Sequence, residues 1–441
     1  MQTKNDYKKH RENLFKKMSP NSIAILATSP ITRRSADQNY PFTPGNDFYY
    51  FTGFPEPEAV AMFIKSEKDG ERYVLFNRRK DPMKEQWSGV RVGQDVAKAE
   101  YQVDAAYPID ELLTKLPDLM CDQEVLYFTW GRYANLDETI KTCLNVIRDR
   151  VRAGVKIPDT LINVEGIVSE MRLIKNKNEI ICMRKAAEIS AAAHKHAMRA
   201  CYPGNNEYHV HAELMYEFLR QGGQGEAYES IVAGGENACI LHYIVNDQVL
   251  KANELLLIDA AVKYKFYCAD LTRTYPISGK YSAEQKAIYE IVLRAQLAAI
   301  AIAKPGVCWF DMEVIARKII TEGLVDLGIL TGSVNDLLAQ NAYLPFYMHR
   351  IGHWLGMDVH DVSRYKVNGE WRALQAGMVT TVEPGIYIKP GLDVDQRWWG
   401  IGIRIEDDVL ITESGTDVLT KDMPKEIAEI ERLMAEARVK K

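Results

Sequence analysis

The sequence lacks the features that mark several special classes of protein. Its seven cysteines are scattered and include no CxxC pair, which indicates reduced, mostly structural thiols in a cytoplasmic protein. No apolar signal core follows the polar and basic amino terminus, so we expect no export. The most apolar helical stretch, Ile291 to Ala303, is short and contains Arg294, which favours a buried helix over a membrane span.

The sequence also lacks a strong excess of positive or negative residues. The 55 basic and 60 acidic residues leave a net charge of −5, which does not favour a nucleic-acid or acidic-membrane partner. A hydrophobic content of 47% and a charged content of 26% are typical of a soluble globular protein. With 441 residues the chain is too long for one ordinary core, so we predict two domains.

The first third of the sequence predicts an α/β domain. Short apolar runs bounded by turn residues predict buried strands at residues 21–28, 59–65 and 72–77. Residues 134–151 have helical spacing. A polar segment at residues 171–179 precedes a long helical pattern, so we place the boundary there. This gives an N-terminal domain of residues 1–173 and a C-terminal domain of residues 174–441.

The C-terminal domain contains a weak internal repeat. Two predicted helices, at residues 179–200 and 283–303, end at Pro-Gly pairs, and amphipathic helices follow at residues 208–221 and 311–327. Ser282 and Gln285 form a capping-box pattern at the start of one of them. Pro-Gly after a helix is common, but the order of elements recurs from Pro203 to Pro305, a spacing of 102 residues. We therefore favour duplication, which would place a site between the halves of an α+β domain.

Two aspartates in the first half of this domain are candidate metal ligands. Four apolar residues precede Asp259, and Asp270 follows eleven residues later. A hairpin with a two-residue loop centred between Tyr264 and Lys265 would place Asp259 directly opposite Asp270. Facing carboxylates repel unless a cation lies between them or one is protonated. The alternative is a solvated turn with two surface aspartates, which the apolar run disfavours.

The densest group of candidate ligands lies in the second half, where three histidines occur within twelve residues: His349, His353 and His360. The spacing of the first two is not the HExxH motif, because Arg350 stands where the glutamate base would be. A lone histidine in an apolar segment is more often a core residue than a ligand. Three histidines accompanied by acidic residues with apolar flanks favour a metal site.

Two glutamates follow this segment, and each closes an apolar run. Glu383 precedes Pro384-Gly385, where a buried strand must end, so its side chain is either a strand-end ligand or a simple strand cap. Alternation in period two places Arg404 and Glu406 on one face of another strand. The alternative for this pair is a surface ion pair on a half-exposed strand.

These candidates form a set of four carboxylates and one imidazole: Asp259, Asp270, His353, Glu383 and Glu406. Such a hard, oxygen-rich set suits two divalent cations that share bridging carboxylates, with Mn²⁺ fitting well and Co²⁺, Fe²⁺ or Zn²⁺ possible. Two adjacent cations can hold a bridging hydroxide as the nucleophile and polarise a carbonyl group.

The order of these five residues is similar to that of the pita-bread metallopeptidases, which include methionine aminopeptidase, prolidase and aminopeptidase P. The segment from His349 to Asp361 resembles the signature that prolidases and aminopeptidase P share. A likeness to bacterial aminopeptidase P runs nearly end to end and includes residues 32–37, 47–54 and 234–243. The resemblance implies an α/β N-terminal domain, a C-terminal pita-bread domain with an internal pseudo-twofold repeat, and Xaa-Pro aminopeptidase activity.

The resemblance also implies a role for each ligand. Asp259 would bind one metal, Asp270 and Glu406 would bridge both, and His353 and Glu383 would complete the pair. Glu383 would also act as general base. The cofactor would be two divalent ions, of which Mn²⁺ is our first expectation.

Further residues take roles around the metals by the same resemblance. His242 and His360 would contact the scissile carbonyl or shuttle protons, and His349 would line the pocket. Three residues resemble an Arg-Asp-Tyr network behind the site, with Arg404 also facing the substrate: Arg404, Asp37 and Tyr387.

The resemblance extends to partners and assembly. The substrates would be peptides with proline at position two, and the protein would be a cytoplasmic homotetramer, a dimer of dimers. Its N-terminal domain would serve oligomerisation and substrate access, and Trp87 resembles an aromatic residue that reaches a neighbouring subunit's pocket. Two departures, Thr43-Pro44 in place of a basic residue and Trp399 in place of arginine, bear on subsites or assembly and not on the ligands.

Three alternative functions remain on the same fold. A prolidase would accept only Xaa-Pro dipeptides and would need a group that binds their free carboxylate, whereas residues 32–37 and Trp87 favour the aminopeptidase. A non-catalytic binding protein generally loses ligands, and all five are present here. The same argument disfavours a creatinase-type amidinohydrolase.

Overall fold

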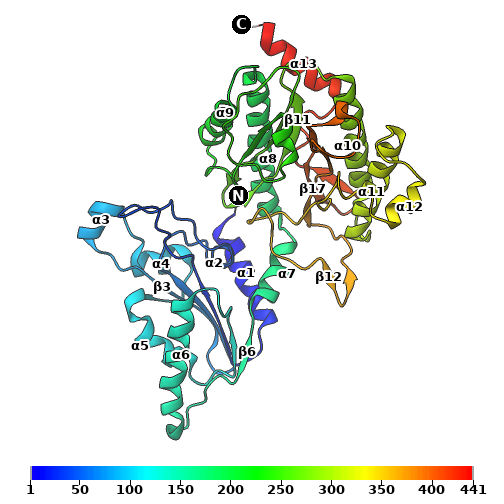
Figure 1. Cartoon of the computed structure of the whole chain (residues 1–441). Coiled ribbons are helices and arrows are strands. Elements are labelled where there is room, and N and C mark those ends of the chain that lie inside the picture. Colours follow the sequence, from blue (N-terminus) through cyan, green and yellow to red (C-terminus); the bar gives the residue numbers. More distant parts are fainter. Residues whose placement is uncertain (1, 440–441) are drawn as a thin grey trace. The chain divides into compact units, whose positions relative to one another are not determined.

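The computed structural model describes residues 2–439, which form two compact units, residues 2–171 and residues 172–439. Figure 1 shows the first unit in blue to cyan-green and the second in green to red. Helix α7 (Glu165–Leu173) contains the division, and the boundary expected from the sequence, between residues 173 and 174, lies two residues beyond it. None of the described helices has the length and apolar composition that a membrane crossing requires.

The first unit is a mixed sheet covered by helices. The sheet has the order β4-β3-β2-β1-β5-β6, in which β1 runs antiparallel to β2 and parallel to β5. Its strands are β1 (Ser22–Ala27), β2 (Val60–Ser66), β3 (Gly70–Asn77), β4 (Ala105–Pro108), β5 (Val125–Tyr127) and β6 (Thr160–Ile162). Its other helices are α1 (Lys4–Lys17), α2 (Asn46–Thr52), α3 (Pro82–Ser88), α4 (Gly93–Tyr101), α5 (Leu112–Met120) and α6 (Ala134–Asp149). The three predicted strands and the predicted helix are confirmed to within two residues at each end.

The core of this unit explains why the apolar runs become strands. Ile23, Met62 and Leu126 from three neighbouring strands pack with Ile140 and Ile147 of α6, and all five side chains are at most 1% exposed. Continuous apolar runs are typical of strands that are buried on both faces. The α/β class predicted for this unit is therefore correct.

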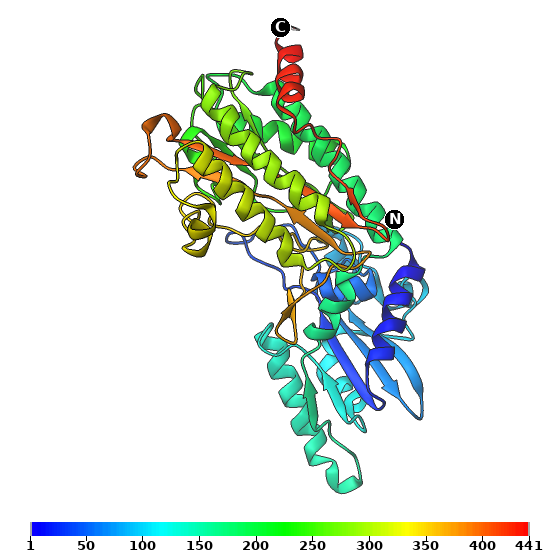
Figure 2. The same ribbon diagram turned by 90° about the vertical axis from the view of Figure 1, so that its right-hand side faces the viewer.

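The second unit repeats a pattern of two helices followed by antiparallel strands. The first pair is α8 (Lys177–Ala200) and α9 (Glu207–Arg220), and the second is α10 (Ala283–Ile302) and α11 (Trp309–Asp326). Figure 2 shows the yellow-green pair α10 and α11 side by side. Helix α10 begins at the predicted capping box, in which Ser282 Oγ accepts from the Gln285 N–H at 3.2 Å and the Gln285 side chain accepts from the Ser282 N–H at 2.9 Å.

The strands of this unit form several small antiparallel sheets. The first half has the sheet order β11-β8-β7, with β7 (Ile231–Gly234), β8 (Leu255–Asp259) and β11 (Thr272–Pro276), and the ribbon β9 (Lys263–Tyr264) with β10 (Tyr267–Cys268). The second half has β14 (Val379–Val382), β17 (Asp407–Ile411) and β18 (Thr416–Val418) in one sheet and β15 (Gly385–Ile388) with β16 (Ile401–Arg404) in another. The remaining elements are the hairpin β12 (Lys366–Val367) and β13 (Glu370–Trp371) and the helices α12 (Val334–Ala339) and α13 (Ile427–Val439).

Candidate metal centre and its cavity

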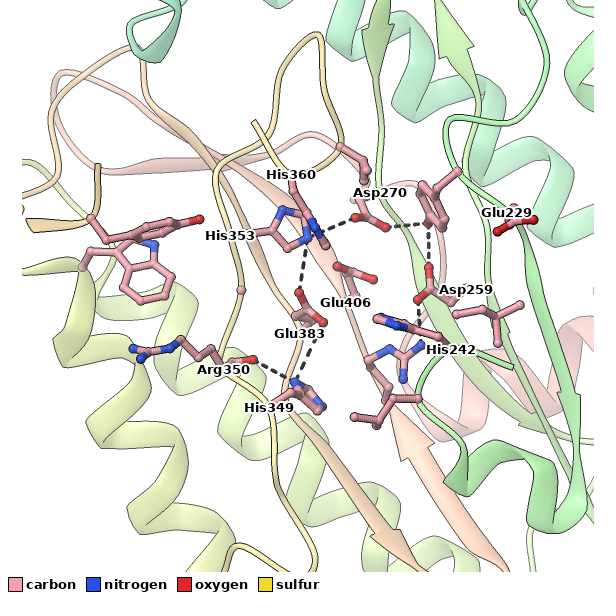
Figure 3. Close-up of a pocket in the computed structure, with 18 of the residues that line it drawn as sticks. Glu229, His242, Asp259, Asp270, His349, Arg350, His353, His360, Glu383 and Glu406 are labelled. Atoms are coloured by element: carbon pink, nitrogen blue, oxygen red, sulfur yellow. Dashed lines mark hydrogen bonds and ion pairs between the residues drawn. The ribbon is translucent and has the colours of Figure 1, made fainter. Parts of the chain in front are cut away.

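The second unit contains a cavity of about 870 Å³, which brings residues from both halves of the repeat together (Figure 3). Its wall includes nine of the residues that the sequence singled out: His242, Asp259, Asp270, His349, His353, His360, Glu383, Arg404 and Glu406. Two other predicted residues, Asp37 and Trp87, belong to the first unit, and Tyr387 lies directly behind the wall. The expected grouping of carboxylates and imidazoles is therefore present within one unit.

Three of the five candidate ligands lie close enough to bind one ion. Asp270, His353 and Glu406 each place one ligand atom within 4.8 Å of the other two. Glu383 adjoins this group, because its Oε1 lies 3.4 Å from His353 Nε2, while Asp270 Oδ2 lies 3.3 Å from the same nitrogen. The centre thus joins a carboxylate of the first half to three groups of the second.

The predicted register of the first-half hairpin is wrong by two residues. The turn lies at Lys265-Phe266, both with positive φ (50° and 68°), and β8 pairs with β11 so that Asp259 faces Thr272 instead of Asp270. Two consecutive residues with positive φ give a turn whose twist matches that of a hairpin. Nothing in the side chains of Lys265-Phe266 favours that conformation, so the sequence placed the turn one residue too early. A shift of two residues preserves the face of a strand, and Asp270 remains next to Asp259.

A tyrosine that sequence reasoning missed joins these two aspartates. The hydroxyl of Tyr228 lies 2.6 Å from Asp259 Oδ1 and 2.5 Å from Asp270 Oδ1. Burial first, and then the two carboxylate charges, raise the pKa of Tyr228 well above its ordinary value, so the hydroxyl stays protonated. Tyr228 precedes β7 in an irregular segment, where no periodic pattern could have revealed it.

The carboxylates of the centre repel one another. Burial, and then the charges of Asp270 and Glu383, raise the pKa of Glu406 well above its ordinary value. Burial also raises the pKa of Glu383 to about 7, although His353 opposes the shift. Burial lowers the pKa of His353, but the hydrogen bond with Asp270 and the charge of Glu383 raise it overall to about 9. A cluster of oxygen ligands with this much unfavourable charge fits divalent cations, which would relieve the repulsion.

The backbone around His353 explains the glycine that precedes it. The segment lies against β14, where the Thr381 N–H donates to the His353 carbonyl at 2.9 Å and the Glu383 N–H donates to the Ile351 carbonyl at 2.8 Å. A Cβ atom on Gly352 would collide with the Thr381 carbonyl oxygen. Glycine at this position therefore allows the close approach that brings His353 and Glu383 together.

Arg404 is buried, not part of a half-exposed surface pair as one interpretation of the sequence allowed. Its side chain donates from Nη2 to Asp259 at 2.7 Å and from Nη1 to the Tyr387 hydroxyl at 2.9 Å, and only 4% of the residue is exposed. The carboxylate that pairs with Arg404 within this unit is Asp259. Asp37, predicted as the acidic member of this network, is an exposed residue of the first unit, and its role stays a prediction.

The three remaining histidines differ in how they are held. His349 Nε2 lies 2.8 Å from the Tyr387 hydroxyl and its Nδ1 lies 2.8 Å from the Arg350 carbonyl. Burial, and then the charge of Arg404, lower the pKa of His349 to about 4, so the ring is neutral. The His360 ring lies edge-on to the His353 ring, 4.2 Å between centroids. The His242 side chain is exposed in the cavity and has no hydrogen-bond partner within residues 2–439.

A second group that sequence reasoning missed is a buried glutamate behind His242. Glu207, the first residue of α9, is fully buried, and it accepts four hydrogen bonds from residues 234–248: from the Gly234 N–H, Asn237 Nδ2, the Tyr243 hydroxyl and the Gln248 N–H, at 2.7 to 3.0 Å. In the second half, the buried Glu313 of α11 accepts from the Ile351 N–H at 2.5 Å. A helical glutamate gives no sequence signal that separates it from a solvated one.

The two departures from the family pattern belong to different units. Trp399, in the second unit, does not line the cavity, and its Nε1 donates to the Leu392 carbonyl at 3.1 Å, whereas Thr43-Pro44 belongs to the first unit. Trp87, in α3 of the first unit, is 89% exposed.

Comparisons with known proteins agree with this architecture. Residues 181–413 match metallopeptidase family M24, and residues 7–127 match the aminopeptidase P N-terminal domain. The chain is 43% identical over 436 residues to the Xaa-Pro aminopeptidase of Escherichia coli (strain K12), with 99% of each chain covered. It is 33% identical to Xaa-Pro aminopeptidase 3 of Mus musculus, over 96% of this chain and 83% of the relative.

Solved structures show the same fold. The aminopeptidase PepP of Pseudomonas aeruginosa matches with a TM-score of 0.98 and 48% identity, and 99% of both chains is covered. Aminopeptidase P from E. coli with the inhibitor Pro-Leu matches with a TM-score of 0.97 and 43% identity, again over 99% of both chains. The predicted combination of an α/β N-terminal part and a pita-bread C-terminal part is confirmed.

Proposed function

The chain belongs to metallopeptidase family M24, and we propose that it is an Xaa-Pro aminopeptidase, which releases the first residue of peptides that have proline at position two. The observation that carries the proposal is the meeting of two aspartates, two glutamates and His353 in one peptide-sized cavity. Relatives named for this activity cover nearly the whole chain.

Two divalent cations, with Mn²⁺ as the first candidate, would be held by the five residues Asp259, Asp270, His353, Glu383 and Glu406, with Asp270 and Glu406 between the two ions. When bound, the two ions would supply a nucleophilic hydroxide and polarise the scissile carbonyl. The donor set supports this assignment, because four carboxylates line one cavity, and burial together with the neighbouring carboxylate charges raises the pKa of Glu406 and Glu383.

The chain's own side chains would then manage protons and orientation. Glu383, whose carboxylate lies at the edge of the centre 3.4 Å from His353 Nε2, would accept a proton and return it to the leaving nitrogen. His242 and His360 would donate hydrogen bonds to the substrate carbonyl as negative charge develops on it. Neutral His349 would line the pocket. Arg404 would orient Asp259 and face the substrate, with Tyr387 fixing the guanidinium.

Selection of proline would rest on apolar contact. An Xaa-Pro bond has no N–H, so a selective site needs a slot for the ring and no acceptor for a backbone hydrogen. Apolar side chains of the cavity supply such surface: Ile231, Leu241, Ile244, Trp309 and Val359. The proline contributes hydrophobic area without a donor that must be satisfied.

The proposed oligomeric state and cellular location are those that the family resemblance implies. We propose a cytoplasmic homotetramer, a dimer of dimers, in which the first unit serves oligomerisation and substrate access. The 89% exposure of Trp87 supports a contact with another subunit, because a large exposed aromatic side chain is typical of interfaces. Light scattering on native protein and on Trp87→Ala tests this assignment.

The decisive experiment compares substrate lengths. We expect hydrolysis of Arg-Pro-Pro after its first residue, stimulation by Mn²⁺ and loss of activity with a chelator. Cleavage of Xaa-Pro dipeptides without tripeptide activity would instead assign a prolidase. Asp270→Ala should lose both bound metal and activity, and retention of both would remove Asp270 from the bridging position.

A further inference from the structure

One wall of the cavity is aromatic. The Trp309 ring lies 4.8 Å from Tyr365 and 6.0 Å from Trp371, measured between centroids, and Phe310 stacks on Trp371 at 4.5 Å. Trp309, Tyr365 and Trp371 all line the cavity. These rings come from α11, from β13 and from Tyr365, the residue before β12, and together they form one surface beside the metal centre.

Two cationic side chains lie over the outermost of these rings. The Arg350 guanidinium carbon is 5.3 Å and the Lys366 ammonium nitrogen 4.7 Å from the centroid of the Trp371 ring. Both residues line the cavity and both are exposed. Within residues 2–439, neither has a carboxylate at ion-pair distance. Cation–π contact holds each charge in place, and each charge is without an ion-pair partner among the described residues.

These two positive side chains therefore lie on one side of the cavity and the acidic side chains on the other. Figure 3 shows Arg350 on the side opposite Asp259 and Glu229, with Glu383 and the other candidate ligands between them. Two like charges over one ring repel, and an anion bound between them would relieve that repulsion. A positive free amino terminus fits the acidic side of the cavity, so an extended peptide would carry its later residues toward Arg350 and Lys366.

We propose that Arg350 and Lys366 form a carboxylate-binding subsite for the part of the peptide that follows the prolyl residue. The ligand would be the free carboxyl terminus of a short peptide or an acidic side chain in a longer one. This inference rests on the proposed function and narrows it to short or acidic peptides. Arg350 also lies next to His349 in the chain, so the subsite is joined directly to the pocket segment.

The test uses matched peptides that differ only in the terminal charge. The ratio of kcat/KM for Ala-Pro-Ala to that for Ala-Pro-Ala amide is measured for the native protein, Arg350→Gln, Lys366→Gln and the double variant. We expect each single variant to lower the ratio about threefold, and the double variant about tenfold, as for partly exposed ion pairs. Arg350→Lys should restore most of the ratio, because it keeps the charge.

Arg364→Gln is the matched control. Arg364 is an exposed arginine two residues before Lys366 that does not line the cavity, so its loss changes the net charge equally and should leave the ratio unaltered. Ala-Pro-Glu amide against Ala-Pro-Gln amide separates an acidic side chain from a chain terminus as the ligand. Raised NaCl should shrink the native preference, because exposed charges are screened.

The possible results distinguish a failure of the proposed aminopeptidase activity from a failure of the carboxylate subsite alone. If the native protein cleaves none of these peptides, the proposed function fails. If it cleaves the acid and amide forms with a ratio that the double variant leaves unchanged, the carboxylate subsite is refuted and the aminopeptidase assignment stands.

Discussion

The two halves of the second unit hold their cavity residues in different ways. The first half, residues 177–276, supplies Asp259, Asp270 and His242 from separate segments. Tyr228 donates a hydrogen bond to each of the two aspartates, and Arg404 donates one to Asp259. In the second half, residues 283–411, the histidines lie within one short segment that hydrogen bonds to β14. The second-half histidines therefore share one segment that is anchored to a strand, whereas the first-half residues come from separate segments that other side chains hold.

The two halves also differ in how each holds a histidine of the cavity. His349 has direct hydrogen bonds to the Tyr387 hydroxyl and to a carbonyl, so its ring is held by its own contacts. His242 has no such partner within the described chain, and its position depends on its neighbour Tyr243, which donates to Glu207 at 2.8 Å. A buried glutamate at a helix start thus replaces, for His242, the contacts that His349 makes itself.

The largest effect is expected from removing the Tyr228 hydroxyl, which hydrogen bonds to both first-half aspartates. Tyr228→Phe deletes one hydroxyl and leaves both carboxylates without their shared hydrogen bond. Partners of this kind typically change metal affinity 10- to 100-fold, so we expect Mn²⁺ affinity to fall by about that factor. Competition with a metal-sensitive dye measures it.

Tyr267→Phe is the control for this experiment. Tyr267 lies in the β9–β10 hairpin between Asp259 and Asp270, and its hydroxyl also donates to a carboxylate, that of Glu179 at 2.8 Å, but it does not line the cavity. Unchanged metal affinity in Tyr228→Phe would show that the tyrosine hydroxyl is not needed to order the first-half ligands, and this part of the contrast between the halves would disappear.

Glu207→Gln tests the support of His242. A glutamine amide cannot accept from all four donors, and one orientation turns its NH₂ group toward the Gly234 N–H, the other toward the Gln248 N–H. Such a buried mismatch costs about 1–3 kcal/mol, so the loop that carries His242 should shift. We expect kcat to fall about tenfold, which corresponds to about 1.4 kcal/mol, with bound metal unchanged.

Two matched variants show whether the effect is specific. Glu179→Gln alters another buried glutamate, one that binds Tyr267 instead of a cavity loop, and should leave kcat near native. Glu313→Gln should lower kcat less than Glu207→Gln, because His349 keeps its own hydrogen bonds. Equal losses of kcat in all three variants, parallel to their loss of thermal stability, would contradict a positioning role for Glu207.

Features that local sequence encodes could be predicted, and features that depend on residues distant in the sequence could not. The helices α8 to α11 and the capping box at Ser282 follow from local periodicity and spacing, and they are correct within a few residues. The hairpin register was wrong because Lys265-Phe266 adopts positive φ without the glycine or asparagine that usually indicates it. Tyr228 and Glu207 were missed because their roles depend on residues 27 to 42 positions away, and no local pattern encodes such contacts.

The smallest expected effect concerns a buried histidine on α8 of the first half. The His194 side chain is fully buried, and its Nε2 lies 2.7 Å from the Ala260 carbonyl next to Asp259. Burial lowers its pKa from 6.5 to about 4, although the bond to Ala260 opposes the shift. In the second half the balance is reversed, because contacts with Asp270 and Glu383 outweigh burial for His353.

The sign of the pH effect for His194 follows from proton binding. Below pH 6.5 the unfolded chain binds a proton at this residue that the folded chain refuses until about pH 4, so stability falls as the pH decreases through that window and changes no further below it. Between pH 7 and 5.5 this histidine should cost about 1 kcal/mol of unfolding free energy. His194→Gln keeps an N–H donor for the Ala260 carbonyl and cannot take up a proton, so urea unfolding followed by tryptophan fluorescence should show a pH dependence reduced by that amount. An identical pH dependence in the variant would mean that His194 is protonated in the folded state, and the contrast with His353 would then be lost.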